Sequence, residues 1–338
     1  MWAKHPFLNE LYEETINGHV EVNDAESRQL LLTKFQGALG QFSRGNLAPL
    51  DPVILAETQK VGYKRYSIEI TTLPALRMQF YLLVPDQLSL ERAPAILALH
   101  GHGYGNKDIV GIENNGAERT CEPGYHRDFA IELVKKGMIV VAPELIGFGD
   151  RRYAPGYTPE SDVDNSCYSL ASQLLLMGKT LAGLRIFECQ RVLDYLQTRK
   201  EVNPDQIGCM GISGGGLVAG FTTVLDERIK AVVVSGYTNT FLGSILDRRH
   251  CLDNYIPGML TIAEMPALIG LIAPRRLLIE AGRQDHLFPE RHVKIAVNQL
   301  TKIYQSFDFE QGLHVHFFDG GHEISGEVSY DWLKEQLS

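Results

Sequence analysis

Short apolar runs alternate with helix-like patterns from residue 95 to the end of the chain. The apolar runs cover residues 95–99, 138–142, 206–212, 229–234, 276–281 and 314–318. Segments with apolar residues at helical spacing cover residues 127–136, 181–198, 214–226, 289–304 and 328–337. Such short continuous runs are typical of parallel strands, because the crossover helices bury both faces of the sheet. The alternation therefore predicts an α/β protein with a mostly parallel central sheet and helices on both faces.

The segment before this alternation has a different pattern. Residues 66–70 and 76–84 are rich in β-forming side chains and predict an antiparallel pair of strands. Residues 1–60 carry apolar side chains at helical spacing, notably Leu8, Tyr12 and Ile16, and a second helix is expected over residues 30–39. We expect an N-terminal helical appendage over residues 1–60 and a main domain over residues 61–338. The alternative, that these helices are the first packing layer of the main domain, remains open.

Two long irregular stretches, residues 144–180 and 236–273, interrupt the pattern of strands and helices. Loops of this length are uncommon in compact domains unless they form lids or binding sites. We therefore expect both stretches to be lid or pocket insertions. The second contains Tyr237, Phe241, Tyr255 and Met259. We expect these side chains, Tyr237 foremost, to shape a substrate pocket, although ordinary core packing would also explain them.

The composition excludes several classes of protein. The 338 residues carry a formal net charge of −9, which argues against a nucleic acid or an anionic membrane surface as partner. No apolar run approaches the roughly 18 residues of a membrane span, and the N-terminus lacks the apolar core of a secretory signal. The five cysteines are odd in number and form no C-x-x-C pair, which disfavours a disulfide framework or a cysteine-based zinc site. These features predict a cytoplasmic protein.

The strongest local motif is Gly211-Ile212-Ser213-Gly214-Gly215, which matches G-x-S-x-G. It lies between an expected strand and an expected helix, where this motif forms a tight turn that exposes the serine oxygen above the sheet. The backbone N–H groups at the start of the helix can then stabilise a developing negative charge. The motif alone would occur by chance in some glycine-rich chains, so its position between strand and helix carries the inference.

An activated serine needs a histidine base, and the base needs an acid that orients it. Asp285 follows the apolar run 276–281, and His322 follows the run that ends at Phe318. In such sheets the acid and then the histidine follow the serine along the chain, each just after a strand. We therefore predict a catalytic triad of Ser213, His322 and Asp285. Asp319 and Glu280 are weaker alternatives for the acid, because Asp319 shares the loop of His322 and Glu280 lies within its strand.

The glycine-rich segment His100-Gly101-His102-Gly103-Tyr104-Gly105 follows the apolar run 95–99. We predict that the backbone N–H groups of His102 and Gly214 form an oxyanion hole, and that Gly103 and Tyr104 contact substrate. The alternative reading of His-x-His is a metal site. No acidic residue adjoins these histidines, and a serine triad needs no metal, so we expect neither a metal nor another cofactor.

With these motifs in place, the chain resembles an α/β-hydrolase over residues 64–338. Within that superfamily it is similar to the dienelactone-hydrolase-like and acetyl-xylan-esterase-like branch. The residues that carry the resemblance are His100-Gly101-His102-Gly103, residues 143–150, Gly211-Ile212-Ser213-Gly214-Gly215, Gly282, Asp285 and Gly321-His322-Glu323. Dienelactone hydrolases use cysteine where this chain has Ser213, and the deacetylases carry Gln where it has Gly214 and an Arg-Gly-Gln motif that it lacks. The resemblance implies an α/β-hydrolase catalytic domain that hydrolyses esters through a serine.

The combined expectation is a serine hydrolase that cleaves small or short-chain carboxylic esters through an acyl-enzyme. The expected partner is a small-molecule ester, and an apolar patch on the N-terminal helices would also allow a homo-oligomer. A serine peptidase or amidase of the prolyl-oligopeptidase kind shares the triad order and remains an alternative. So does a non-catalytic binding protein on a hydrolase scaffold, because a fold alone does not fix function.

Overall fold

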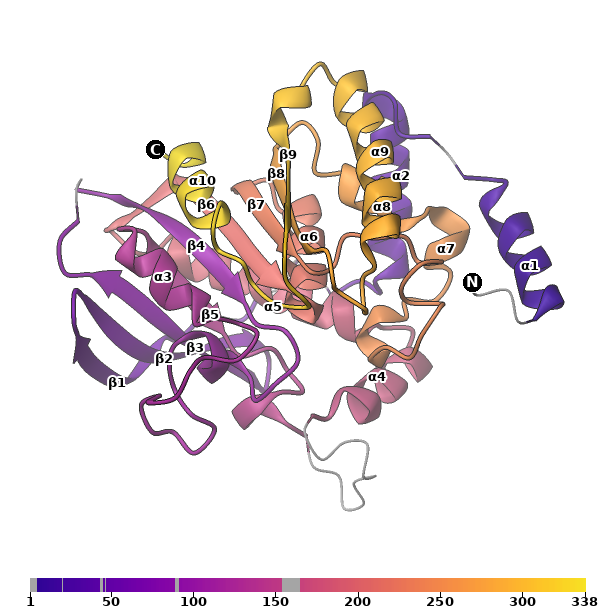
Figure 1. Ribbon diagram of the computed structural model, residues 1–338. Helices are drawn as coiled ribbons and strands as arrows, with labels where there is room; N and C mark the ends of the chain where they lie inside the picture. Colours follow the sequence, from indigo (N-terminus) through magenta and orange to yellow (C-terminus); the bar gives the residue numbers. More distant parts are fainter. Residues whose placement is uncertain (1–4, 20, 43–44, 46, 89–90, 154–164) are drawn as a thin grey trace.

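A nine-stranded sheet forms the centre of the computed structural model, which describes residues 5–19, 21–42, 45, 47–88, 91–153 and 165–338 (Figure 1). The strand order is β1-β2-β3-β5-β4-β6-β7-β8-β9. The strands are β1 (Val53–Lys60), β2 (Tyr63–Leu73), β3 (Leu76–Pro85), β4 (Ala93–Leu99), β5 (Ile139–Pro143), β6 (Val202–Ile212), β7 (Ile229–Ser235), β8 (Arg276–Gly282) and β9 (Leu313–Phe318). The six strands from β5 to β9 in this order are parallel, which confirms the predicted mostly parallel sheet.

The other three strands form an antiparallel extension of the parallel sheet. β2 pairs antiparallel with β3, as predicted, and β3 then pairs antiparallel with β5. β1 pairs antiparallel with β2 at the outer edge of the sheet. The carboxyl ends of the six parallel strands therefore meet at one edge, where the loops after β4, β6, β8 and β9 can bring their side chains together.

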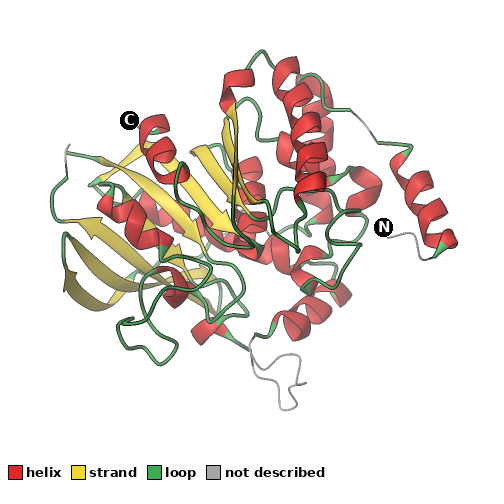
Figure 2. Ribbon diagram, viewed as in Figure 1, coloured by secondary structure: helices red, strands yellow, loops and turns green. Residues whose placement is uncertain are grey.

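Helices cover both faces of the sheet, as Figure 2 shows with strands in yellow and helices in red. The helices are α1 (Pro6–Ile16), α2 (Ala25–Ala38), α3 (Phe129–Lys135), α4 (Cys167–Leu176), α5 (Leu181–Leu196), α6 (Gly214–Leu225), α7 (Met259–Ile262), α8 (Met265–Gly270), α9 (Glu290–Ser306) and α10 (Ser329–Gln336). Successive side chains of β4 point to opposite faces. Leu97 and Leu99 join the core under α2, α5, α6, α8 and α9, whereas Ile96 and Ala98 join the core under α3 and α10. No described helix is long and apolar enough to cross a membrane.

The N-terminal segment differs from the prediction of a helical appendage over residues 1–60. β1 belongs to the main sheet, so the sheet begins at Val53 rather than after residue 60. The helix α2 is part of the main core, because Phe35 is fully buried and its ring packs edge-on against Phe221 of α6 at 4.8 Å. The helix α1 stands apart from the sheet (Figure 1), and the hydroxyl of its Tyr12 donates a hydrogen bond to Glu264 at 3.1 Å.

Candidate active site

Ser213 lies in the turn between β6 and α6, with φ 57° and ψ −124°. This conformation is strained for a residue with a side chain, and a tight turn of this kind exposes the serine hydroxyl. The two flanking glycines allow the turn to form. A Cβ atom at Gly211 would lie 2.2 Å from the carbonyl oxygen of Gly215, and one at Gly215 would lie 2.2 Å from the carbonyl oxygen of Leu99. The G-x-S-x-G spacing is therefore a steric requirement of this turn.

His322 and Asp285 lie side by side at the ends of β9 and β8. The Nδ1 atom of His322 lies 2.7 Å from Oδ2 of Asp285. The other oxygen of Asp285 accepts hydrogen bonds from the backbone N–H groups of Leu287 at 2.8 Å and Phe288 at 3.0 Å. Burial alone would raise the pKa of Asp285, but the hydrogen bond and charge of His322, together with these two N–H groups, lower it below its usual value. An ionised Asp285 requires the proton of His322 to be on Nδ1, which leaves Nε2 as the basic atom.

The imidazole of His322 contacts two aromatic rings. The rings of Tyr125 and Phe288 both stack against it, with centroid distances of 5.6 Å and 5.7 Å. Its Nε2 atom is shielded from solvent and has no hydrogen-bond partner among the described residues. This nitrogen is therefore available to a group that binds beside Ser213. The sequence contains no motif around Tyr125 that would have predicted its contact with the histidine.

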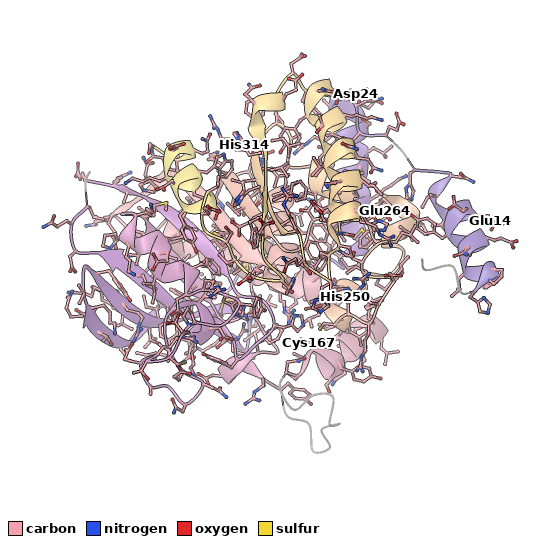
Figure 3. All side chains as sticks on the ribbon, viewed as in Figure 1. Glu14, Asp24, Cys167, His250, Glu264 and His314 are labelled. Atoms are coloured by element: carbon pink, nitrogen blue, oxygen red, sulfur yellow. The ribbon has the colours of Figure 1, made fainter. Side chains whose placement is uncertain are left out.

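A cavity of about 700 Å³ lies at the carboxyl ends of the parallel strands. Ser213 and His322 both line it, and so do the predicted oxyanion residues His102 and Gly214. Figure 3 shows Cys167 and His250, which also line the cavity, near each other below the sheet. The two expected insertions contribute much of the wall: Asn165, Cys167 and Tyr168 come from the first, and Arg249, His250, Cys251, Leu252, Asn254 and Tyr255 from the second.

Buried polar side chains hold the glycine-rich loop after β4. The N–H of Gly101 donates to Nε2 of His126 at 2.9 Å, and the N–H of Tyr104 donates to Asp108 at 2.9 Å. The hydroxyl of Tyr125 donates to the carbonyl oxygen of His102 at 2.5 Å. Burial, followed by the charges of neighbouring histidines, lowers the pKa of His126 far below its usual value, so this ring is neutral and can accept the Gly101 hydrogen bond.

The three predicted substrate contacts lie in different places. Gly103 and Tyr104 line a second cavity of about 440 Å³, which shares His102 and Asn165 with the first. Tyr237 does not line either cavity, because its ring is 2% exposed and packs between Phe221 and Phe288 in the core. The structure therefore corrects the expectation that Tyr237 contacts substrate.

The alternative acids have other roles in the structure. Glu280 on β8 is fully buried and accepts four hydrogen bonds of 3.0–3.2 Å, from Ser235, Ser325, Gly326 and Ser329. It thereby ties the loop that follows His322 to the centre of the sheet. Asp319 is exposed and lies 3.5 Å from the guanidinium of Arg283. Neither carboxylate is hydrogen-bonded to the histidine.

The two histidines of His-x-His do not face a common point. Both nitrogens of His100 are in use, since Nδ1 lies 2.8 Å from the carbonyl oxygen of Gly101 and Nε2 accepts the N–H of Leu145 at 3.1 Å. His102 instead points toward Cys167, Cys251 and Asp253, three residues that the sequence analysis did not connect with the site. They come from the two long insertions, whose folded paths no local pattern indicates.

A serine at a strained strand–helix turn, with an acid and a histidine after later strands of a mostly parallel sheet, defines the α/β-hydrolase fold. A profile of the Abhydrolase family matches residues 41–299, and the chain belongs to this family. The resemblance and the fold class expected from the sequence are thereby confirmed.

Curated and solved relatives support the same assignment. The chain is 34% identical over 219 residues to the "Putative hydrolase YtaP" of Bacillus subtilis (strain 168), covering 62% of this chain and 67% of that protein. A "putative acetyl xylan esterase" from Bacteroides fragilis superimposes with a TM-score of 0.76 at 16% identity, covering 100% of this chain and 90% of that chain. A glucuronoyl esterase from Solibacter usitatus gives a TM-score of 0.64 at 16% identity and 93% coverage of both chains. At these identities the two structures show a shared fold.

Proposed function

We propose that this protein is a serine hydrolase that cleaves carboxylic esters through an acyl-enzyme. Ser213 attacks the ester carbonyl, and Nε2 of His322 accepts the serine proton and then delivers it to the leaving alcohol. Asp285 keeps the histidine proton on Nδ1 and stabilises the imidazolium that forms. Water, activated by the same histidine, then releases the acid and regenerates Ser213.

One observation carries the proposal. The strained Ser213 and His322 line the same cavity, and Nε2 of His322 has no hydrogen-bond partner among the described residues. The other ring nitrogen, Nδ1, lies 2.7 Å from the Asp285 carboxylate. A merely structural histidine would be expected to have both nitrogens hydrogen-bonded when buried. The strained Ser213 also has no evident packing role, because it lines the cavity.

The oxyanion would be stabilised by the backbone N–H groups of Gly214 and His102. Gly214 begins α6, so its N–H belongs to the positive end of the helix dipole. A Cβ atom at Gly214 would lie 3.3 Å from the His102 ring, so the two residues are neighbours at the cavity wall. Donors that are fixed before the reaction are worth roughly 3–4 kcal/mol each in the transition state.

A short acyl ester with a polar alcohol fits this site best. The cavity wall combines apolar Leu252 and Leu287 with polar Asn165, Asn254 and Arg249, and a volume of about 700 Å³ suits a small molecule. The names of two structural neighbours, an acetyl xylan esterase and a glucuronoyl esterase, point to carbohydrate esters as the class to test first.

The test is hydrolysis of p-nitrophenyl acetate, butyrate and octanoate by the wild type and by Ser213→Ala. We expect the wild type to prefer the shorter esters and the variant to lose roughly four to six orders of magnitude in kcat. A fluorophosphonate should label the wild type and not the variant. Equal activity of the two proteins would refute Ser213 as nucleophile, and an unlabelled, inactive wild type would favour a binding protein.

A further inference from the structure

Four potential metal-binding side chains meet at the wall of the cavity. They are His102 from the loop after β4, Cys167 at the start of α4, Cys251 just before η4 (Leu252–Asn254), and Asp253 within η4. One ligand atom from each lies within 4.8 Å of the ligand atoms of the other three. We call these four residues the thiol cluster.

The ligand set of the thiol cluster is that of a zinc site. Zn²⁺ prefers thiolate, imidazole and carboxylate ligands in a tetrahedral arrangement. With bonds of about 2.0–2.3 Å, the ligand atoms of such a site lie roughly 3.3–3.8 Å apart. The cluster would therefore need to contract by about an ångström at its widest pair, which side-chain torsions can provide.

Neighbouring groups already orient two of the four side chains. The guanidinium of the buried Arg185 donates to Oδ2 of Asp253 at 2.6 Å and to Sγ of Cys167 at 3.2 Å. The amide of Asn254 donates to the other oxygen of Asp253 at 2.7 Å. Outer contacts of this kind fix the ligands of a metal site and strengthen metal binding.

The charges and the free nitrogen of the thiol cluster also favour a cation. Two thiolates and the Asp253 carboxylate would carry three negative charges, which balance a divalent cation together with Arg185. The Nε2 atom of His102 is shielded from solvent and has no hydrogen-bond partner among the described residues. A buried polar atom without a partner needs an explanation, and a missing ligand supplies one.

We propose that the thiol cluster binds a thiophilic divalent cation such as Zn²⁺, and that its occupation blocks hydrolysis at Ser213. Binding displaces the remaining thiol protons to solvent and forms two metal–sulfur bonds without any oxidation. The inhibitory part rests on the proposed function, because His102 also contributes to the proposed oxyanion hole. A Cβ atom at Gly214 would lie 3.3 Å from the His102 ring and 3.6 Å from Oδ2 of Asp253, so the cation would sit beside the oxyanion position.

The first experiment titrates the full-length, reduced protein with Co²⁺, which has visible bands in a tetrahedral site and near-ultraviolet bands with thiolate ligands. We expect saturable 1:1 binding by the wild type with both kinds of band. Cys251→Ser removes one of the two thiolates, so its near-ultraviolet intensity at saturation should fall to about half, and Cys251→Ala serves as a second variant if the serine variant misfolds. Cys121→Ser is the matched control, because Cys121 is an exposed free cysteine outside the thiol cluster.

Absence of thiolate bands in the wild type, or their loss in Cys121→Ser, would overturn the site.

The second experiment adds Zn²⁺ during hydrolysis of p-nitrophenyl acetate and compares each protein with its own metal-free rate. The wild type and Cys121→Ser should lose most of their activity, whereas Cys251→Ser should lose little. Zn²⁺ binding without loss of activity would overturn the inhibition. An inactive protein that still gives the cobalt–thiolate bands would refute the proposed function and support the site.

Discussion

The Nδ1 atom of His322 and Oδ2 of Asp285 are joined by a hydrogen bond of 2.7 Å, although the two residues lie at the ends of different strands. This contact assigns the histidine tautomer, because the carboxylate, whose pKa is lowered, can only accept. The geometry depends on β8 and β9 being parallel neighbours with Gly282 opposite Phe318.

Replacing this carboxylate by an amide tests its role directly. Asp285→Asn keeps the size of the side chain but allows the wrong histidine tautomer, so we expect kcat for ester hydrolysis to fall by roughly a thousandfold to ten-thousandfold. Asp319→Asn is the matched control, since Asp319 is exposed and pairs with Arg283 instead. An Asp285→Asn variant within a few-fold of the wild type would remove Asp285 from the mechanism.

The glycines of α6 offer a steric test within one helix. Gly215→Ala places a Cβ atom 2.2 Å from the backbone oxygen of Leu99 and 2.5 Å from that of His100, so the strand and the turn must move apart. We expect the free energy of unfolding to fall by about 1–3 kcal/mol and the activity to be lost. Gly220→Ala is the control, because its nearest contact would be an ordinary 3.6 Å to Val234. This control should gain up to about 1 kcal/mol from helix propensity. Urea unfolding measures both.

Glu280 should act on catalysis through the loop that carries the histidine. Glu280→Gln places an amide donor against groups that already donate to it, such as the N–H of Gly326 and the hydroxyl of Ser329. We expect the free energy of unfolding to fall by about 1–3 kcal/mol. We also expect kcat to fall, with little change in the access of a fluorophosphonate to Ser213. Glu327→Gln, at an exposed position, should leave both properties unchanged. Equal stability of the two variants would contradict this account of the buried carboxylate.

Acid should destabilise the fold through His126. Burial holds its pKa well below the ordinary 6.5, so as the pH falls below about 6.5 the unfolded chain binds a proton that the folded protein does not. The free energy of unfolding should therefore fall by up to about 1.4 kcal/mol per pH unit for this one group until its folded pKa is reached.

The change is measured as the difference in urea stability between pH 7.5 and pH 5.5. That difference should be smaller in His126→Gln, whose side-chain oxygen can still accept the N–H of Gly101. His314→Gln, at an exposed histidine, should keep the wild-type difference. His250 contributes in the same direction, since burial lowers its pKa to about 4, so some acid sensitivity should remain in His126→Gln.

The sheet and the three triad candidates could be predicted because local patterns encode them. Buried parallel strands need continuous apolar runs, and the turn at Ser213 needs small residues at Gly211 and Gly215. Both requirements can be recognised as local sequence patterns. The strand β1 has no such local pattern. Its side chains are almost all exposed at the edge of the sheet, so nothing imposes an alternation of apolar and polar residues.

The environment of the triad candidates depends on contacts between distant segments. Tyr125 reaches His322 from a loop without a motif, and the thiol cluster is assembled from three separate segments. Tyr237 was expected to line a pocket because it lies in the long irregular stretch 236–273, but its ring packs in the core beside Phe288. A sequence pattern identifies which residues end a strand, whereas the direction of each side chain is decided by packing that forms only in the folded protein.

Tyr125 contacts two parts of the site at once. Its ring stacks on His322, and its hydroxyl donates to the backbone of His102. The proposed base and the proposed oxyanion loop therefore share the support of one side chain, and a substitution that moves either loop should alter the other. The effects of changes at these positions should consequently be non-additive, which restricts the order in which this site could acquire a new substrate during evolution.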